Sequence, residues 1–228
     1  MMFNILFSIV LILFSISAMS FGTASSSWSS AEQNFTFQKK SFFVDESKLA
    51  HVVGEVKNIS NKPVTDIIVQ ASFYDSHHTL LNKFKRSTDI RTLNPGDITP
   101  FEILYYDFKT VDLIHNYTLS AIGKDTAVKP KALHIESYNS RIDILGFYYV
   151  NGIISNKGPE PATETLVIAT MYDKNGNVIS IGRAMAEPVN ITSHSEAAFG
   201  IAITDKLQTY KVKNFSLSAD SDQYGFLS

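Results

Sequence analysis

Residues 54–75 read GEVKNISNKPVTDIIVQASFYD, and this stretch decides the predicted fold. Apolar residues alternate with other residues on either side of a turn that contains Pro63, which is the pattern of two half-buried strands. The second strand ends at the pair Tyr74-Asp75. The same arrangement returns as GIISNKGPEPATETLVIATMYD at residues 152–173, each position 98 residues after its first counterpart. The sequence therefore predicts one β unit made twice.

The residues that the two copies share occupy turns and strands. They include Gly54, Asn58, Pro63, Tyr74 and Asp75 in the first copy, and Gly152, Asn156, Pro161, Tyr172 and Asp173 in the second. A glycine inside a strand indicates a bulge or a close backbone approach. The Tyr-Asp pairs either form a binding edge or are structural, with a buried, bonded Tyr and an Asp that binds turn amides. Because Asp commonly starts turns, we favour the structural interpretation.

About seven short strands per copy are typical of an immunoglobulin-like sandwich. We predict an all-β chain of two tandem antiparallel β-sandwiches behind a hydrophobic leader helix. The expected boundaries are a leader at 1–24, a Ser-rich spacer at 25–34, sandwiches at 35–123 and 132–228, and a linker at 124–131. Single helical turns are expected within 108–116 and 206–214. The short linker favours two domains set end to end.

Three segments of the first copy, GEVKN at 54–58, ASFYD at 71–75 and NPGD with PFEI ending at Ile103, together resemble an FxLYD domain. That family comprises small extracytoplasmic β-sandwiches of bacteria and archaea. Ala71 and Phe73 stand in the Phe and Leu positions of the family's name, so only Tyr74 and Asp75 match it strictly. The resemblance implies an exported sandwich and supplies no catalytic residues.

Composition limits the classes of partner. The 228 residues carry a formal charge of −2, which leaves no basic excess for neutralising nucleic-acid phosphates. We therefore expect no nucleic-acid partner. The chain has no cysteine, so stability must come from packing and strand pairing rather than disulfides.

The first 24 residues predict export. The apolar run Ile5 to Ile16 has the length of a signal-peptide core and is short for a bilayer span. Small residues at Gly22, Thr23 and Ala24 suit cleavage, although a tilted membrane anchor remains an alternative. In either case we expect an extracytoplasmic protein, secreted or anchored to the membrane facing outward.

Five sequons agree with that location. They begin at Asn34, Asn58, Asn116, Asn190 and Asn214. Each is either a glycosylation acceptor or an ordinary turn and strand-end residue, because so short a triplet often arises by chance.

His77-His78 is the one candidate metal site. His115, Asp75 or Asp107 would join it if the loops converge. The second copy has Asn175, Gly176 and Lys213 at the equivalent positions, so the repeat does not support a metal site and we expect no cofactor. Catalytic motifs such as G-x-S-x-G and H-E-x-x-H are absent from the sequence, and we expect no enzymatic activity.

The leading hypothesis is a non-catalytic surface or secreted interaction protein. It would recognise a protein or envelope component through edge strands or loops. The alternative is an envelope accessory protein that binds a metal or small ligand through His77 and His78.

Overall fold

The computed structural model describes residues 34–227. The predicted leader and nearly all of the spacer lie outside these residues. Within them the chain is almost entirely β-strand, which confirms the predicted all-β class. No helix in this range is long and apolar enough to cross a bilayer.

The first sandwich has the seven strands expected of it. They are β1 (Phe35–Val44), β2 (Ala50–Asn58), β3 (Val64–Tyr74), β4 (Leu80–Ser87), β5 (Thr92–Leu93), β6 (Ile98–Tyr105) and β7 (Asn116–Asp125), with a 3₁₀ helix, η3, at Val111–Leu113. One sheet has the order β1-β2-β6, and in the other β3 pairs with β4, β5 and β7. The helical turn predicted within 108–116 is η3.

The second sandwich repeats this plan. Its elements are β8 (Lys131–Ile142), β9 (Tyr148–Asn156), β10 (Leu166–Tyr172), β11 (Val178–Met185), β12 (Glu196–Ile203), α1 (Lys206–Thr209), β13 (Asn214–Asp220) and β14 (Gly225–Phe226). The layers β8-β9-β12 and β11-β10-β13 correspond to β1-β2-β6 and β4-β3-β7. Strand β14 pairs with both β13 and β8, and so joins the two layers into one seven-stranded sheet.

The aspartates that the copies share start the hairpin turns. Asp75 Oδ1 accepts the backbone N–H groups of His77 and Thr79, each at 2.8 Å. Asp173 binds the second and fourth following amides in the same way. The structural interpretation of the Asp positions is therefore correct. The Tyr positions differ, because Tyr172 is buried while Tyr74 is only partly so.

The shared glycines allow a close backbone approach, as predicted. A Cβ on Gly152 would lie 2.3 Å from the carbonyl oxygen of Ser137 and 2.6 Å from the Phe199 ring. Gly54 is similarly close to Phe101. Gly54 sits opposite the bulge where the β1–β2 register shifts, and Gly152 lies one residue beyond the corresponding shift between β8 and β9.

Asn58 and Asn156 are fully buried and hold the turn that follows their strand. Asn58 donates from Nδ2 to the carbonyls of Lys62 (2.8 Å) and Leu93 (2.9 Å), and accepts from Ser60. Asn156 makes the equivalent bonds. Both amide hydrogens of Asn58 are thus engaged, so its sequon offers no accessible acceptor in the folded chain. This corrects one of the five glycosylation candidates.

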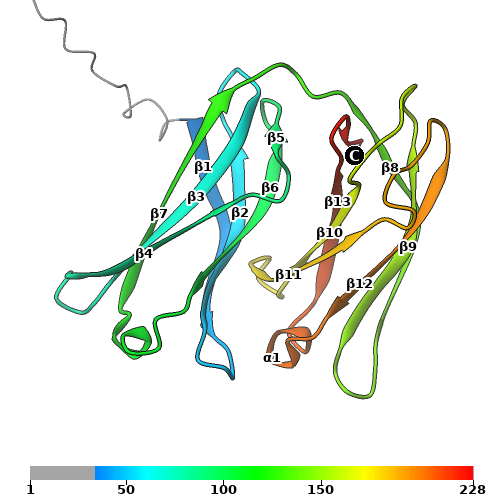
Figure 1. Ribbon diagram of the computed structural model, residues 1–228. Helices are drawn as coiled ribbons and strands as arrows, with labels where there is room; N and C mark the ends of the chain where they lie inside the picture. Colours follow the sequence, from blue (N-terminus) through cyan, green and yellow to red (C-terminus); the bar gives the residue numbers. More distant parts are fainter. Residues whose placement is uncertain (1–33, 228) are drawn as a thin grey trace, which may run out of the picture.

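The two sandwiches lie side by side, not end to end as the linker length suggested. Figure 1 shows four layers in succession: β4-β3-β7, β1-β2-β6, β10-β11-β13 and β8-β9-β12. The outer face of β2 contacts β11, and the buried core of the first sandwich continues into Ile168 and Ile181 of the second. A linker of residues 126–130 therefore returns the chain alongside itself rather than extending it.

Asn58→Ala and Asn156→Ala should each lower the free energy of unfolding by about 1–3 kcal/mol, because buried carbonyls lose their donors. Urea unfolding of the full chain measures this. Asn214→Ala is the matched control, since Asn214 is exposed, and should change stability by less than about 0.5 kcal/mol. Equal effects at all three positions would contradict the structural role.

Candidate functional site

An apolar contact joins the two sandwiches. Val53 on β2 is fully buried, and it belongs to the same core cluster as Ile168, Val178 and Ile181 of the second sandwich. These side chains point away from the core of their own sandwich, because neighbouring strand residues face opposite sides. Burying each isoleucine contributes about 1.5–3 kcal/mol, so the contact holds the domains together.

A buried carboxylate lies inside this contact. Glu55 accepts a hydrogen bond from the Tyr172 hydroxyl at 2.6 Å and one from the Gln38 amide at 2.7 Å, and Lys39 Nζ lies 3.3 Å away. The Lys39 ammonium also lies 4.7 Å from the centre of the Tyr172 ring. Burial, with the adjacent Glu55, raises the pKa of Tyr172 to about 12, so its hydroxyl remains a donor.

A chain of ion pairs crosses the interface beside it. Arg183 of β11 donates to Asp89 at 2.7 Å and to Glu102 at 3.3 Å, both in the first sandwich. Glu102 also contacts His51 Nδ1 at 3.2 Å, and His51 Nε2 lies 3.2 Å from Asp45. Arg86 lies within 4 Å of both Asp89 and Glu102. With His51 protonated, three carboxylates face three cations.

His51 is therefore held between two acidic groups. Burial disfavours its charged form, but hydrogen bonds and charge attraction from Glu102 and Asp45 outweigh burial and raise the pKa of His51 above its ordinary 6.5. Burial acts to raise the pKa of Glu102, but the hydrogen bond with His51 and the charges of Arg183, His51 and Arg86 lower it overall. The Phe43 ring stacks on the imidazole at 4.6 Å and covers one face.

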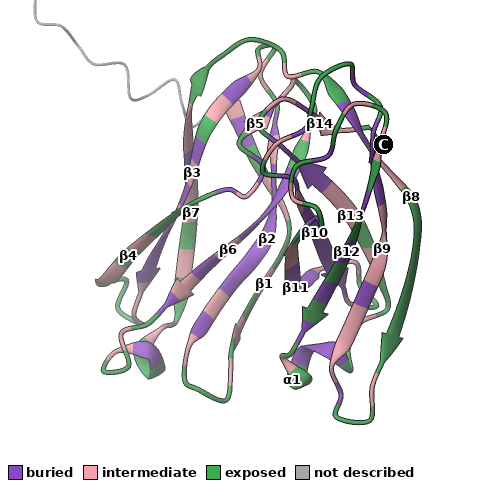
Figure 2. Ribbon diagram, turned by 45° about the vertical axis from the view of Figure 1, so that its right-hand side comes forward, coloured by how far each residue is buried: buried purple, intermediate pink, exposed green. Residues whose placement is uncertain are grey.

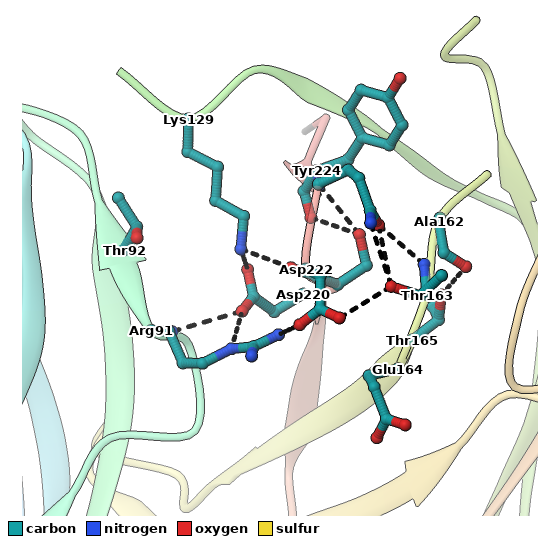
Figure 3. Close-up of polar contacts among 12 residues, drawn as sticks. Arg91, Thr92, Lys129, Ala162, Thr163, Glu164, Thr165, Asp220, Asp222 and Tyr224 are labelled. Carbon is teal, nitrogen blue, oxygen red and sulfur yellow. Dashed lines mark hydrogen bonds and ion pairs between the residues drawn. The ribbon is translucent and has the colours of Figure 1, made fainter. Parts of the chain in front are cut away.

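A second ionic cluster fixes the linker (Figure 3). Lys129 donates to the buried Asp220 carboxylate at 2.5 Å and to the Ser221 carbonyl at 2.6 Å. Arg91 of the first sandwich lies 3.6 Å from Asp220 and 2.6 Å from Asp222. Burial raises the pKa of Asp220 even though these cations oppose it. The cluster joins linker, first sandwich and second sandwich at one point.

The linker is also bonded to the first sandwich. Asn94 donates to the Lys129 carbonyl at 2.9 Å and accepts from the Lys129 N–H at 3.0 Å. Lys131 pairs with Asp97 at 2.7 Å. An open cavity of about 280 Å³ lies next to these contacts and is lined by residues of both sandwiches. Its two lysines, Lys129 and Lys131, are already paired with carboxylates.

Strand β12 forms one edge of the seven-stranded sheet. Ala198 exchanges backbone hydrogen bonds with Glu187, so its N–H and C=O point away from β9. Because backbone groups alternate along a strand, Gly200 and Ala202 direct theirs to the same edge, and both residues are exposed. The equivalent strand β6 carries Pro100 and Glu102 in place of Ala198 and Gly200. Pro and charged residues are common protections of a sheet edge.

A hollow of about 480 Å³ lies on the outer face next to this edge. Gly152 is part of its lining, where any larger residue would collide with Ser137 and Phe199. The lining is uncharged and comprises Ser137, Tyr138, Asn139, Asn151, Gly152, Ile153, Ala198 and Phe199. The edge and the hollow together form a surface on which an extended chain can lie.

The structure does not bring the predicted metal ligands together. His77 and His78 are exposed at the tip of the β3–β4 hairpin, and His78 has a φ of +62°. Within residues 34–227, no three or more His, Cys, Asp or Glu side chains are grouped so that they could hold a metal ion. His115 and Asp107 thus do not join the histidines in such a group.

The remaining sequons differ in exposure. Asn116, Asn190 and Asn214 are exposed, and Asn34 is partly buried. Asn116 and Asn214 occupy equivalent positions at the start of β7 and β13. The three exposed asparagines are therefore accessible and keep the sequence form of a glycosylation site.

Sequence reasoning missed the interface residues. Nothing in the motifs or the turn pattern marks Glu55, Arg183 or Lys129 as functional residues. A signal was present, because the copies differ at these faces: Glu55 corresponds to Ile153, and Ile168 corresponds to Gln70. Where the two copies differ at strand positions that point away from their own core, the two outer faces make different contacts.

Comparisons with known proteins add little. No protein-family model and no curated protein matches the chain. Among solved structures it is similar to the exo-chitosanase CsxA of Amycolatopsis orientalis, with a TM-score of 0.31, 11% identity, and coverage of 82% of this chain and 26% of that one. Red sea bream transglutaminase gives a TM-score of 0.28 and 10% identity over 82% of this chain and 30% of that one. The chain spans less than a third of either protein, and likenesses this distant carry no argument. The resemblance to FxLYD domains stays a prediction.

The double substitution Ile168→Gln and Ile181→Lys should separate the sandwiches, because the apolar contact between them is lost. The first copy carries Gln70 and Lys83 at these positions, so the sandwich itself should stay folded. Small-angle scattering should report a larger radius of gyration. Ile153→Glu makes the analogous exchange on the uncovered face, where the first copy has Glu55, and should leave the scattering unchanged. A compact double variant would refute the importance of this contact.

The His51 contacts should make stability pH-dependent. Because its folded pKa is raised, the contribution is fully present below the unfolded pKa of about 6.5 and is lost as pH rises through the folded value. Unfolding free energies of the parent and His51→Gln should therefore differ most at about pH 5 and converge towards about pH 9. A difference that does not vary with pH would rule out this linkage.

Proposed function

We propose that this chain is a non-catalytic, extracytoplasmic interaction protein that recognises a protein or envelope partner by adding a partner strand to β12. The observation that carries the proposal is the contrast between the two copies at one edge. β6 has Pro100 and Glu102 at this edge, whereas β12 has Ala198, whose backbone is bonded to Glu187, followed by the exposed residues Gly200 and Ala202. Strand addition uses such groups for affinity and neighbouring surface hollows for specificity.

The uncharged hollow beside β12 supports the same proposal. Alternate side chains of an added strand would lie over the face that contains Asn151 and Ile153. A partner segment rich in small or apolar residues suits this lining, because no charge there needs a counter-ion. The hollow and the β12 edge belong to the same sandwich, so both are already positioned by one folded sheet, which favours binding without a large ordering cost.

Export and surface location are part of the proposal. They rest on the apolar leader and on the exposed sequons at Asn116, Asn190 and Asn214. The metal-binding alternative at His77 and His78 gains no support from the geometry, so we do not carry it further.

Gly200→Glu should weaken partner capture from intact cells at least about tenfold, because it places a charged side chain on the edge of β12. A Cβ at this position meets only the Asn151 side chain, at 3.0 Å, so the fold should tolerate the change. Ser87→Glu on β4, an edge strand of the first sandwich, is the control and should bind normally.

Hydrogen exchange locates the contact. A bound partner should slow exchange of the Gly200 and Ala202 amides and leave those of β4 unchanged. Recovery of no partner and no self-association, or a partner that leaves these two amides unprotected, would refute strand addition at β12.

A further inference from the structure

One end of the second sandwich carries a projecting apolar tip. It is formed by the β8–β9 hairpin and the α1 segment, which are bonded to each other through the Thr209 hydroxyl and the Gly146 carbonyl at 2.6 Å. Ile144 is 98% exposed and Tyr210 74% exposed, and Ile142, Leu145 and Leu207 are also exposed. Figures 1 and 2 show the hairpin reaching beyond the other loops at this end of the domain.

The fold does not require apolar residues at these positions. The first sandwich makes the same turn, in which Asp45 binds the same two backbone amides that Asp143 binds in the second. Yet where the second copy has Ile144, Leu145, Leu207 and Tyr210, the first has Glu46, Ser47, Lys109 and Asp112. The first sandwich folds with polar residues at these positions, so the fold does not explain the exposed apolar residues of the second. Exposed apolar side chains of this kind indicate a contact with something outside the chain.

Charge distinguishes the two tips as well. Residues 141–147 and 205–213 carry four cations, Arg141, Lys206, Lys211 and Lys213, against Asp143 and Asp205, a net charge of +2. The equivalent residues 43–49 and 107–115 carry Lys48 and Lys109 against Asp45, Glu46, Asp107 and Asp112, a net charge of −2. The first sandwich also exposes Tyr106, Phe108 and Leu113 near this end, but beside an acidic tip.

We infer that the tip of the second sandwich inserts into the interfacial region of an anionic lipid bilayer. A convex hairpin offers no cavity for a partner's side chains, whereas a bilayer accepts projecting aliphatic groups. Tyr210 suits the water–lipid boundary, because its ring is apolar and its hydroxyl polar. The surrounding Lys and Arg side chains attract anionic head groups, each by an amount that salt reduces. This contact is independent of the β12 edge.

The chain's lack of cysteine allows a site-specific test on the full protein. An environment-sensitive fluorophore is attached at Leu145→Cys, and at Ile59→Cys in a turn of the first sandwich as the control. Vesicles of phosphatidylcholine with phosphatidylglycerol should shift the emission of the probe at position 145 to the blue, and less so at high salt. The probe at position 59 should not change. If the protein attached to vesicles through its leader alone, the probe at position 145 would stay in water and its emission would not shift. An unshifted emission would therefore contradict the inference.

A second variant set exchanges the tip for its equivalent. With the probe at Tyr210→Cys, Ile144→Glu and Leu145→Ser should weaken vesicle binding through the tip roughly 10- to 100-fold, because two aliphatic groups no longer enter the bilayer. Thermal unfolding should be unchanged, since the first copy forms this turn with those residues. An emission shift that survives the exchange would overturn the inference. So would a shift that appears without vesicles as protein concentration rises, which would assign the tip to self-association.

Discussion

Ile168 and Ile181 lie against the face of β2 that carries Val53, and a carboxylate, Glu55, is enclosed in the same contact. Removing a carboxylate from water is costly unless donors replace the water, so the position of Glu55 fixes what can lie opposite it. Tyr172 supplies one donor from the second sandwich, and Gln38 another from the first. The register between the sandwiches follows from this requirement, because a shift by one strand residue would leave the carboxylate without its partner.

The linker and the ion pairs depend on that register. Lys129 reaches Asp220 only because the sandwiches lie side by side, and Arg183 reaches Asp89 and Glu102 for the same reason. Ion pairs that bring residues from separate domains together add orientation more than net stability. The apolar contact thus provides attraction, and the charged groups determine one arrangement among many.

Repetition made the fold predictable, and asymmetry made the sites hard to predict. Alternation around Gly54, turn residues such as Asp75 and the offset between copies specify strands and turns, because these depend on local chemistry. The arrangement of the domains did not follow from the linker, because it depends on contacts such as Glu55 with Tyr172 between residues far apart in the sequence. Asn58 illustrates the same limit: its triplet has the form of a glycan acceptor, but only tertiary structure shows both amide hydrogens engaged.

The packing of unlike faces has one more consequence. The contact is heterologous, because the outer face of β1-β2-β6 meets the outer face of β10-β11-β13 rather than its own kind. Copies that kept both faces would stack head to tail, either closing into a ring or growing into a filament. Gln70 and Lys83 occupy the positions of Ile168 and Ile181 on the first sandwich, and Ile153 that of Glu55 on the second. These exchanges act as end caps, which let a duplicated domain join to itself once within a chain while disfavouring the growth of a fibre between chains.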